Sequence, residues 1–135
     1  MQRDFRLPAE DESYLDAINL PWETLLDGGT RWLVVHERPV PPGYSVRYVS
    51  AALMVQPGYP DAELDMVYFN PSVLRADGVP IRALATHSIR GTMWQRWSRH
   101  RTRQNPWRPG VDCIATHLAL VDHWLARELA KGAAA

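Results

Sequence analysis

The sequence predicts an α+β fold, in which helices near the two ends of the chain cover one face of an antiparallel sheet. Two observations lead to this prediction. The candidate strands follow one another between residues 22 and 69, and the clearest helical periodicity lies near the C-terminus. A chain of 135 residues is long enough for one domain, so we expect a single domain over residues 1–135.

The N-terminal part of the chain predicts a helix followed by a hairpin. Residues 8–19 begin with a proline, carry acidic residues in the first turn and place apolar side chains at helical spacing. Pro21 ends this helix. Residues 22–40 then predict two strands, which are joined by Asp-Gly-Gly at 27–29 because these residues tolerate the positive φ angles of a tight turn.

The middle of the chain predicts two further strands and a long loop. Residues 45–56 and 66–69 predict the third and fourth strands, separated by a loop rich in proline and glycine. Residues 70–90 show no clear period, which predicts an irregular segment, and loops of this length are commonly functional or mobile. Residues 91–100 alternate weakly and predict a short strand or an extended stretch. The expected sheet is therefore a four-stranded antiparallel meander followed by a long loop.

The last helix is the clearest element of the sequence. Gly110 or Asp112 can cap it, and it runs to about Ala130. Its apolar stripe has helical spacing and consists of Ile114, Leu118, Val121, Leu125 and Leu129.

Composition excludes several classes of protein. No apolar run is long enough to cross a bilayer, and the N-terminus has no apolar core behind its charges, so we expect a cytoplasmic protein without a membrane partner. A single cysteine cannot form an internal disulfide. His117 and His123 lie on different faces of the last helix, and His36 lacks the second histidine of a zinc-protease motif, so we expect no metal.

Residues 94–108 interleave three tryptophans with five arginines. Arginine pairs with phosphate and indole rings stack on bases, so the segment has the composition of a nucleic-acid surface. The net charge of the whole chain is zero and no nucleic-acid-binding motif is present. We therefore expect the tryptophans to anchor the core and loop, and we do not expect nucleic acid as a partner.

Two residues are candidate nucleophiles. Cys113 stands at the start of the last helix, where the helix N-terminus favours a thiolate, although a lone cysteine beside an apolar stripe is commonly a small core residue. Ser98 shares a face with His100 if residues 94–100 are extended. His100, or His87 from the preceding loop, would then be the base that a serine hydroxyl requires. The residues alone favour an ordinary strand serine at position 98.

Five stretches of the sequence together resemble one protein family. They are LPAEDESYLDAI, WETLLDGGTRWLVVHERPVPPGY, PPGYSVRYVSAALMVQPGYPDAELDMVYFNP, WQRWSRH and NPWRPGVDCIATHLALVDHWL. The chain resembles the ubiquitin-conjugating enzyme (UBC) superfamily, specifically its prokaryotic family E, over essentially its whole length. The resemblance implies a UBC-like fold with a long active-site loop, and a bacterial conjugating transferase without a cofactor. The implied partners are a ubiquitin-like protein, a ThiF-type activating enzyme and an amine of a target protein.

The resemblance also implies where the acceptor lies. In the superfamily an acceptor cysteine precedes the tryptophan of a Trp-x-Pro turn by a short interval. Counting back by that interval from Trp107 leads to Ser98 and Arg99, where there is no cysteine. Ser98 is therefore the first choice, and it implies an oxyester. Cys113 lies beyond the turn and is the alternative acceptor, through a thioester. A catalytically silent binding module for the ubiquitin-like protein is the other alternative.

The resemblance implies roles for the remaining candidates. The His-Pro-Asn element of the superfamily is matched only by His87, so the usual asparagine is missing. Arg99, His100 or backbone N–H groups would then meet the developing negative charge, with Trp107 in a positioning role. Asp112 would orient or deprotonate an incoming lysine, or would simply cap the helix.

Overall fold

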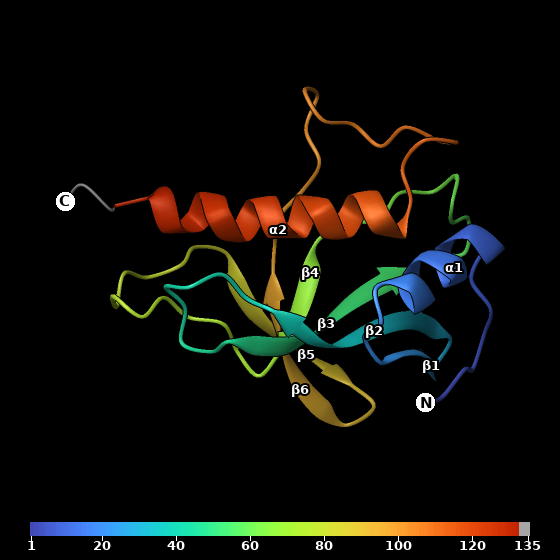
Figure 1. Cartoon of the computed structure of the whole chain (residues 1–135), viewed down its shortest axis with the longest axis horizontal. Helices are drawn as coiled ribbons and strands as arrows, with labels where there is room; N and C mark the ends of the chain where they lie inside the picture. The colour runs from blue at the N-terminus through green and yellow to red at the C-terminus, as the bar shows by residue number, and fades with distance from the viewer. Residues whose placement is uncertain (133–135) are drawn as a thin grey trace.

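The computed structural model describes residues 1–132, and it confirms an α+β fold with a helix near each end and an antiparallel sheet between them (Figure 1). The elements, in chain order, are α1 (Ala9–Ala17), β1 (Trp22–Asp27), β2 (Thr30–Pro39), β3 (Tyr48–Val55), β4 (Val67–Asn70), β5 (Leu84–Ile89), β6 (Thr92–Trp97) and α2 (Ile114–Ala130).

The sheet has six strands in the order β1-β2-β3-β4-β6-β5, with every neighbouring pair antiparallel. The first four form the expected meander, but the prediction of only four strands was wrong. Part of the expected loop at 70–90 is β5, an edge strand, and β6 pairs on both sides. The turn between them uses Arg90 and Gly91, both with positive φ. The short strand predicted within residues 91–100 is confirmed as β6. Its partner β5 was missed, because Arg-Gly is not a usual turn signal and the half-exposed β5 has little apolar alternation.

The β1–β2 hairpin forms as its sequence predicts. Asp27 pairs with Thr30, and the two glycines between them have φ of +54° and +91°. Two successive positive φ angles make the turn type whose twist matches that of the flanking strands.

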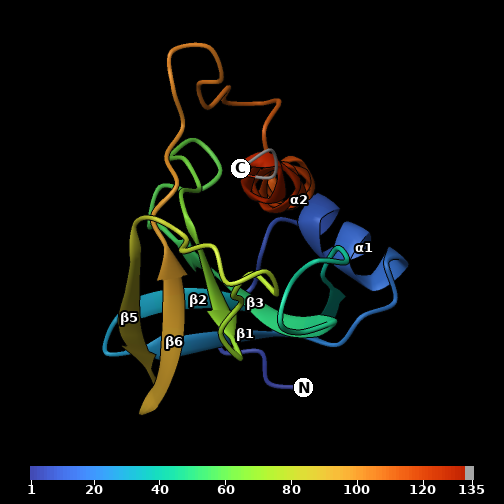
Figure 2. The ribbon, with the colours of Figure 1, turned by 90° about the vertical axis from the view of Figure 1, so that its left-hand side faces the viewer.

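Helix α2 covers one face of the sheet, and α1 packs on the same side (Figure 2). Four of the five predicted stripe residues of α2 are buried and the fifth is partly buried, in one cluster with Leu33, Phe69 and Trp97 of the sheet. The helix begins at Ile114 with Cys113 as its N-cap, so the prediction of Gly110 or Asp112 as the cap was wrong. The Asp112 N–H donates to the carbonyl of Arg108, which keeps residues 108–112 in a turn before the helix.

The outer face of the sheet, which is the face directed away from α2, carries a second apolar cluster. Its buried members include Trp32, Tyr68 and Trp94. The cluster is enclosed because the sheet curls until the β5–β6 turn meets the β1–β2 turn (Figure 2). The Arg90 N–H donates to Asp27 Oδ2 at 3.0 Å, which ties the two hairpins together.

Candidate functional site

The segment 98–112 connects β6 to α2 and projects beyond the helix (Figure 1). Two side chains anchor it to the loop before β4. Trp107 Nε1 donates to the carbonyl of Pro60 at 3.0 Å, and Arg101 Nε donates to the carbonyl of Leu64 at 3.0 Å. The Arg101 guanidinium also lies over the Trp107 ring, 4.6 Å from its centroid. Trp107 thus fixes the segment in place.

Ser98 is the first residue after β6 and is partly buried. Its N–H donates to the carbonyl of Ala83, and its Oγ accepts a hydrogen bond from Arg96 Nε at 3.1 Å. Arg96 was missed as a site residue by sequence reasoning. Its proximity to Ser98 could nevertheless have been predicted, because residues two apart on a strand project from the same face.

His100 does not lie beside the Ser98 hydroxyl as the extended chain predicted. The Arg99 N–H donates back to the carbonyl of Trp97, so the chain turns directly after β6. His100 Nδ1 instead lies 2.8 Å from Asp65 Oδ2, and 63% of the His100 side chain is exposed. His100 and Asp65 therefore form an accessible pair on their own.

His87 lies away from Ser98, along the same hairpin. It pairs with Trp94 in the β5–β6 register, and its ring centroid is 5.4 Å from those of Trp32 and Tyr68. Trp94 is four residues before Ser98, which is about 13 Å along a strand. His87 therefore belongs to the outer face, where its ring packs against aromatic side chains.

Arg99 is bound to the C-terminal end of α2. Its guanidinium donates to Glu128 Oε1 at 3.2 Å and to the carbonyl of Arg82 at 3.0 Å. Because these partners occupy the guanidinium, Arg96 rather than Arg99 supplies the positive charge at the Ser98 hydroxyl.

Cys113 lies at the opposite end of α2. As the N-cap, its N–H donates to Thr116 Oγ1 at 2.9 Å. The next N–H, of Ile114, donates to the hydroxyl of Tyr59 at 3.0 Å. Fifteen residues along the helix separate Cys113 from Glu128, which binds Arg99, and this is about 22 Å at the usual rise. Ser98 and Cys113 therefore lie in two different places and do not form one site.

Asp112 is buried in the turn before α2 and accepts a hydrogen bond from the Arg108 N–H at 2.7 Å. Burial opposes ionisation, but this hydrogen bond, contacts with the side chains of Thr116 and Arg108, and the charge of Arg101 outweigh it and lower the pKa of Asp112. The carboxylate therefore holds the Trp-x-Pro turn.

A buried contact between Arg101 and His117 ties the segment to α2, and it was not predicted from sequence. The Arg101 guanidinium lies 2.9 Å from His117 Nδ1, and His117 Nε2 lies 2.9 Å from the carbonyl of Met66. Burial is the main cause that lowers the pKa of His117 to about 4. The imidazole is thus neutral, with Nε2–H as a donor and Nδ1 as an acceptor. The spacing of His117 from Ile114 and Val121 was the signal that it faces the core. His123, on the other side of the helix as predicted, is exposed.

Two adjoining pockets, each of about 240 Å³, lie between the segment 98–112 and the C-terminal half of α2. Both are lined by His100, Trp124 and Arg127. Across residues 1–132, no three His, Cys, Asp or Glu side chains come together to hold a metal ion. None of the helices formed by those residues has the length and apolar character to cross a membrane.

The order of helix, antiparallel sheet, connecting segment and covering helix is consistent with an E2-like fold. The model of the family described as Prokaryotic E2 family E matches residues 7–128, and the chain belongs to this family. The predicted resemblance is therefore confirmed. No curated protein and no solved structure matches the chain. Membership makes the protein a ubiquitin-conjugating-like carrier in general terms, a class that acts with a ubiquitin-like protein and an activating enzyme.

Proposed function

We propose that Ser98 accepts the C-terminal acyl group of a ubiquitin-like protein as an oxyester, and that the protein then transfers this group to an amine of a target protein. Residues 1–135 would act as one conjugating domain, which a ThiF-type activating enzyme charges. The observation that carries the proposal is the place of Ser98 in a member of this family. Its hydroxyl stands where β6 ends, at the head of the segment that leads through the Trp-x-Pro turn into α2.

The charging step exchanges one acyl bond for another. Ser98 Oγ attacks the carbonyl carbon of the ubiquitin-like C-terminus, which the activating enzyme carries as a thioester. A C–O bond forms, the C–S bond breaks, the thiolate leaves, and the hydroxyl proton passes to a base. In the transfer step the target amine attacks the oxyester carbonyl. A C–N bond forms, and Ser98 Oγ leaves and recovers a proton.

The Arg96 guanidinium supports this role of Ser98, because it already donates to the hydroxyl oxygen. A fixed cationic donor at this place stabilises negative charge that develops on the serine oxygen or on the carbonyl oxygen beside it. We assign to Arg96 the charge-stabilising role expected of Arg99, whose guanidinium is held by Glu128.

The pair of His100 and Asp65 supports proton transfer near the segment 98–112. The ring of His100 is exposed, and the Asp65 carboxylate holds it in place through a contact of 2.8 Å. We propose that His100 takes the proton of the incoming amine. Trp107 and Asp112 act as positioning residues in this proposal, since the first anchors the segment and the second holds its turn.

The pockets beside His100 support a binding site for an extended peptide. They adjoin the residues that follow Ser98, and Trp124 offers an apolar wall in each. We propose that they receive the C-terminal tail of the ubiquitin-like protein, which must lie extended for its last carbonyl to reach a nucleophile.

The experiment incubates the protein with its activating enzyme, its ubiquitin-like partner and ATP, and follows the covalent adduct by gel electrophoresis. We expect an adduct that resists thiol reductant and is cleaved by hydroxylamine or mild base. The variant Ser98→Ala should abolish it. Cys113→Ala and Ser88→Ala, the latter a matched change at an exposed strand serine, should leave it intact.

Each other outcome would overturn the assignment. An adduct that reductant removes and that Cys113→Ala abolishes would make the protein a thioester carrier. An adduct unaffected by either substitution would place the acceptor elsewhere. Binding of the ubiquitin-like protein without any adduct would make the chain a silent binding module.

A further inference from the structure

A row of polar side chains crosses the outer face of the sheet, away from the segment 98–112. His36 of β2 lies at its centre. Its Nδ1 is 2.7 Å from Ser50 Oγ on β3, and its Nε2 is 2.8 Å from Glu23 Oε2 on β1. The side chains of His36 and Glu23 are 26% and 21% exposed, and Ser50 is partly exposed. The row is therefore ordered and also open to a small reactant.

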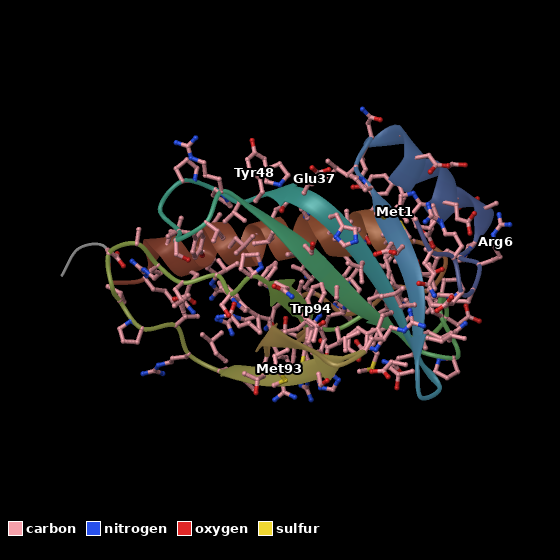
Figure 3. The ribbon with its side chains drawn as sticks, turned by 90° about the horizontal axis from the view of Figure 1, so that it is seen from below. Met1, Arg6, Glu37, Tyr48, Met93 and Trp94 are labelled. Carbon is pink, nitrogen blue, oxygen red and sulfur yellow. The ribbon has the colours of Figure 1, made fainter. Side chains whose placement is uncertain are left out.

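The backbone around His36 departs from regular strand geometry. The register between β2 and β3 shifts between Val35 and Arg38, which is a β-bulge. Glu37, the exposed residue within it, has φ of +55°, a conformation that costs free energy for any residue other than glycine. Glu37 and Tyr48 stand together at this part of the outer face (Figure 3). Bulges of this kind redirect side chains and are frequent beside active sites.

The contacts show which atoms of Glu23, His36 and Ser50 donate hydrogen bonds and which accept them. Glu23 also accepts a hydrogen bond from the Gln2 N–H. Partial burial opposes its ionisation, but the hydrogen bonds from His36 and Gln2 outweigh burial and lower the pKa of Glu23. With an ionised Glu23, the tautomer that satisfies both contacts has His36 donating from Nε2–H. Nδ1 then accepts a hydrogen bond from the Ser50 hydroxyl.

Two neighbours of Ser50 complete the site. Asn70 of β4 is paired with Ser50 in the antiparallel register, which puts their Cβ atoms about 5 Å apart on the same face. Its side-chain amide can donate to an oxygen beside Ser50, as asparagine does in known oxyanion sites. Tyr48 lies two residues along β3 on the same face and is 62% exposed. Its ring offers apolar contact to an acyl group.

We propose that Ser50, His36 and Glu23 form a second nucleophilic site, which reacts with carboxylic esters by acyl transfer to Ser50. Nucleophile, base and orienting carboxylate are in hydrogen-bond contact in the order that such triads require, whatever the fold that holds them. Ser50 and His36 are the catalytic residues, and Glu23 is a positioning residue. The inference stands apart from the proposed function, since it involves neither Ser98 nor a ubiquitin-like protein.

The reaction balances without a cofactor. Ser50 Oγ attacks the ester carbonyl as its proton moves to His36 Nδ1, and Asn70 faces the oxyanion. The bond from carbon to the leaving oxygen breaks, and that oxygen takes the proton from His36 and departs as the alcohol, which returns His36 to its neutral form. Water then attacks the acyl-Ser50 ester with His36 as the base, which releases the carboxylic acid and restores the hydroxyl.

The test incubates the full chain with p-nitrophenyl acetate and locates the acetyl groups by peptide mass spectrometry. We expect acetylation at Ser50 at least about 100-fold faster than in the His36→Gln variant, because general-base assistance contributes at least this much in established sites. Glu23→Asp should retain more of the rate than Glu23→Gln, since only the former keeps a carboxylate. Ser88→Ala, a change at an exposed serine of β5, should leave the rate unchanged.

One measurement needs no variant and so does not depend on whether a substitution folds. Within the wild-type protein, Ser50 should acquire acetyl at least about 10-fold faster than Ser88. Equal rates at these serines, or an unchanged rate in a folded His36→Gln protein, would overturn the proposal. Acetyl at Ser98 in place of Ser50 would also overturn it, while leaving the proposed acceptor role of Ser98 standing.

Discussion

The buried imidazole of His117 should make the protein lose stability in mild acid. Its pKa is lowered by burial to about 4 in the folded state, against 6.5 for an unperturbed histidine. The unfolded chain therefore takes up this proton at a higher pH than the folded chain. The contribution of His117 to stability is fully present above pH 6.5 and is lost as the pH falls from 6.5 to 4.

The size of the effect follows from the difference between the two pKa values. Over the whole interval the loss is about 3 kcal/mol, because each pKa unit corresponds to about 1.4 kcal/mol. Between pH 7 and pH 5 the same linkage gives a loss of about 2 kcal/mol in the free energy of unfolding.

The assay is urea unfolding followed by tryptophan fluorescence at pH 7 and pH 5, for the wild type and two variants. His117→Gln keeps an N–H donor for the carbonyl of Met66 but does not titrate, so its loss between the two pH values should be smaller by about 2 kcal/mol. His123→Gln, at the exposed histidine of the same helix, should behave like the wild type. Carboxyl groups titrate alike in all three proteins and cancel. If the losses of the wild type and His117→Gln agreed within about 0.5 kcal/mol, His117 would not be the group responsible for the acid sensitivity.

Three substitutions and one control, each measured by urea unfolding at pH 7, test the packing and polar contacts. Leu118→Ala, at a fully buried residue of the α2 stripe, should lower the free energy of unfolding by about 3 kcal/mol because it leaves a cavity. Tyr59→Phe removes the hydroxyl that donates to the buried Asp11 and should cost about 2 kcal/mol, whereas Tyr48→Phe, at an exposed ring, should cost almost nothing. Arg75→Met frees the last carbonyls of α2 from a buried cation and should cost about 3 kcal/mol; no loss would show that this cation is dispensable.

The elements that could be predicted are those defined by local sequence. The apolar stripe of α2 and the glycine turn between β1 and β2 each depend on residues that are close to one another in the sequence. Both formed as expected. The edge strand β5 depends on its pairing with β6, because its own alternation is weak, and sequence periodicity therefore missed it.

The candidate sites show the same division. The resemblance, together with the interval before the Trp-x-Pro turn, selected Ser98 as the candidate acceptor, and the family match confirms that resemblance. The partners of these residues could not be located in this way. Ser98 contacts Arg96, and His100 contacts Asp65, which lies thirty-five residues earlier.

The fold class, the two helices, the first four strands and the family could therefore all be predicted from the amino-acid sequence. These follow from periodicity, turn residues and motif order, all of which are properties of contiguous chain. The contacts between side chains that are far apart in the sequence could be identified only in the folded chain. The register of β2 and β3 that sets His36 beside Ser50, and the curl that closes the outer face, arise from pairing between strands that are separated along the chain. Such contacts depend on register and sheet twist, which no short stretch of sequence specifies.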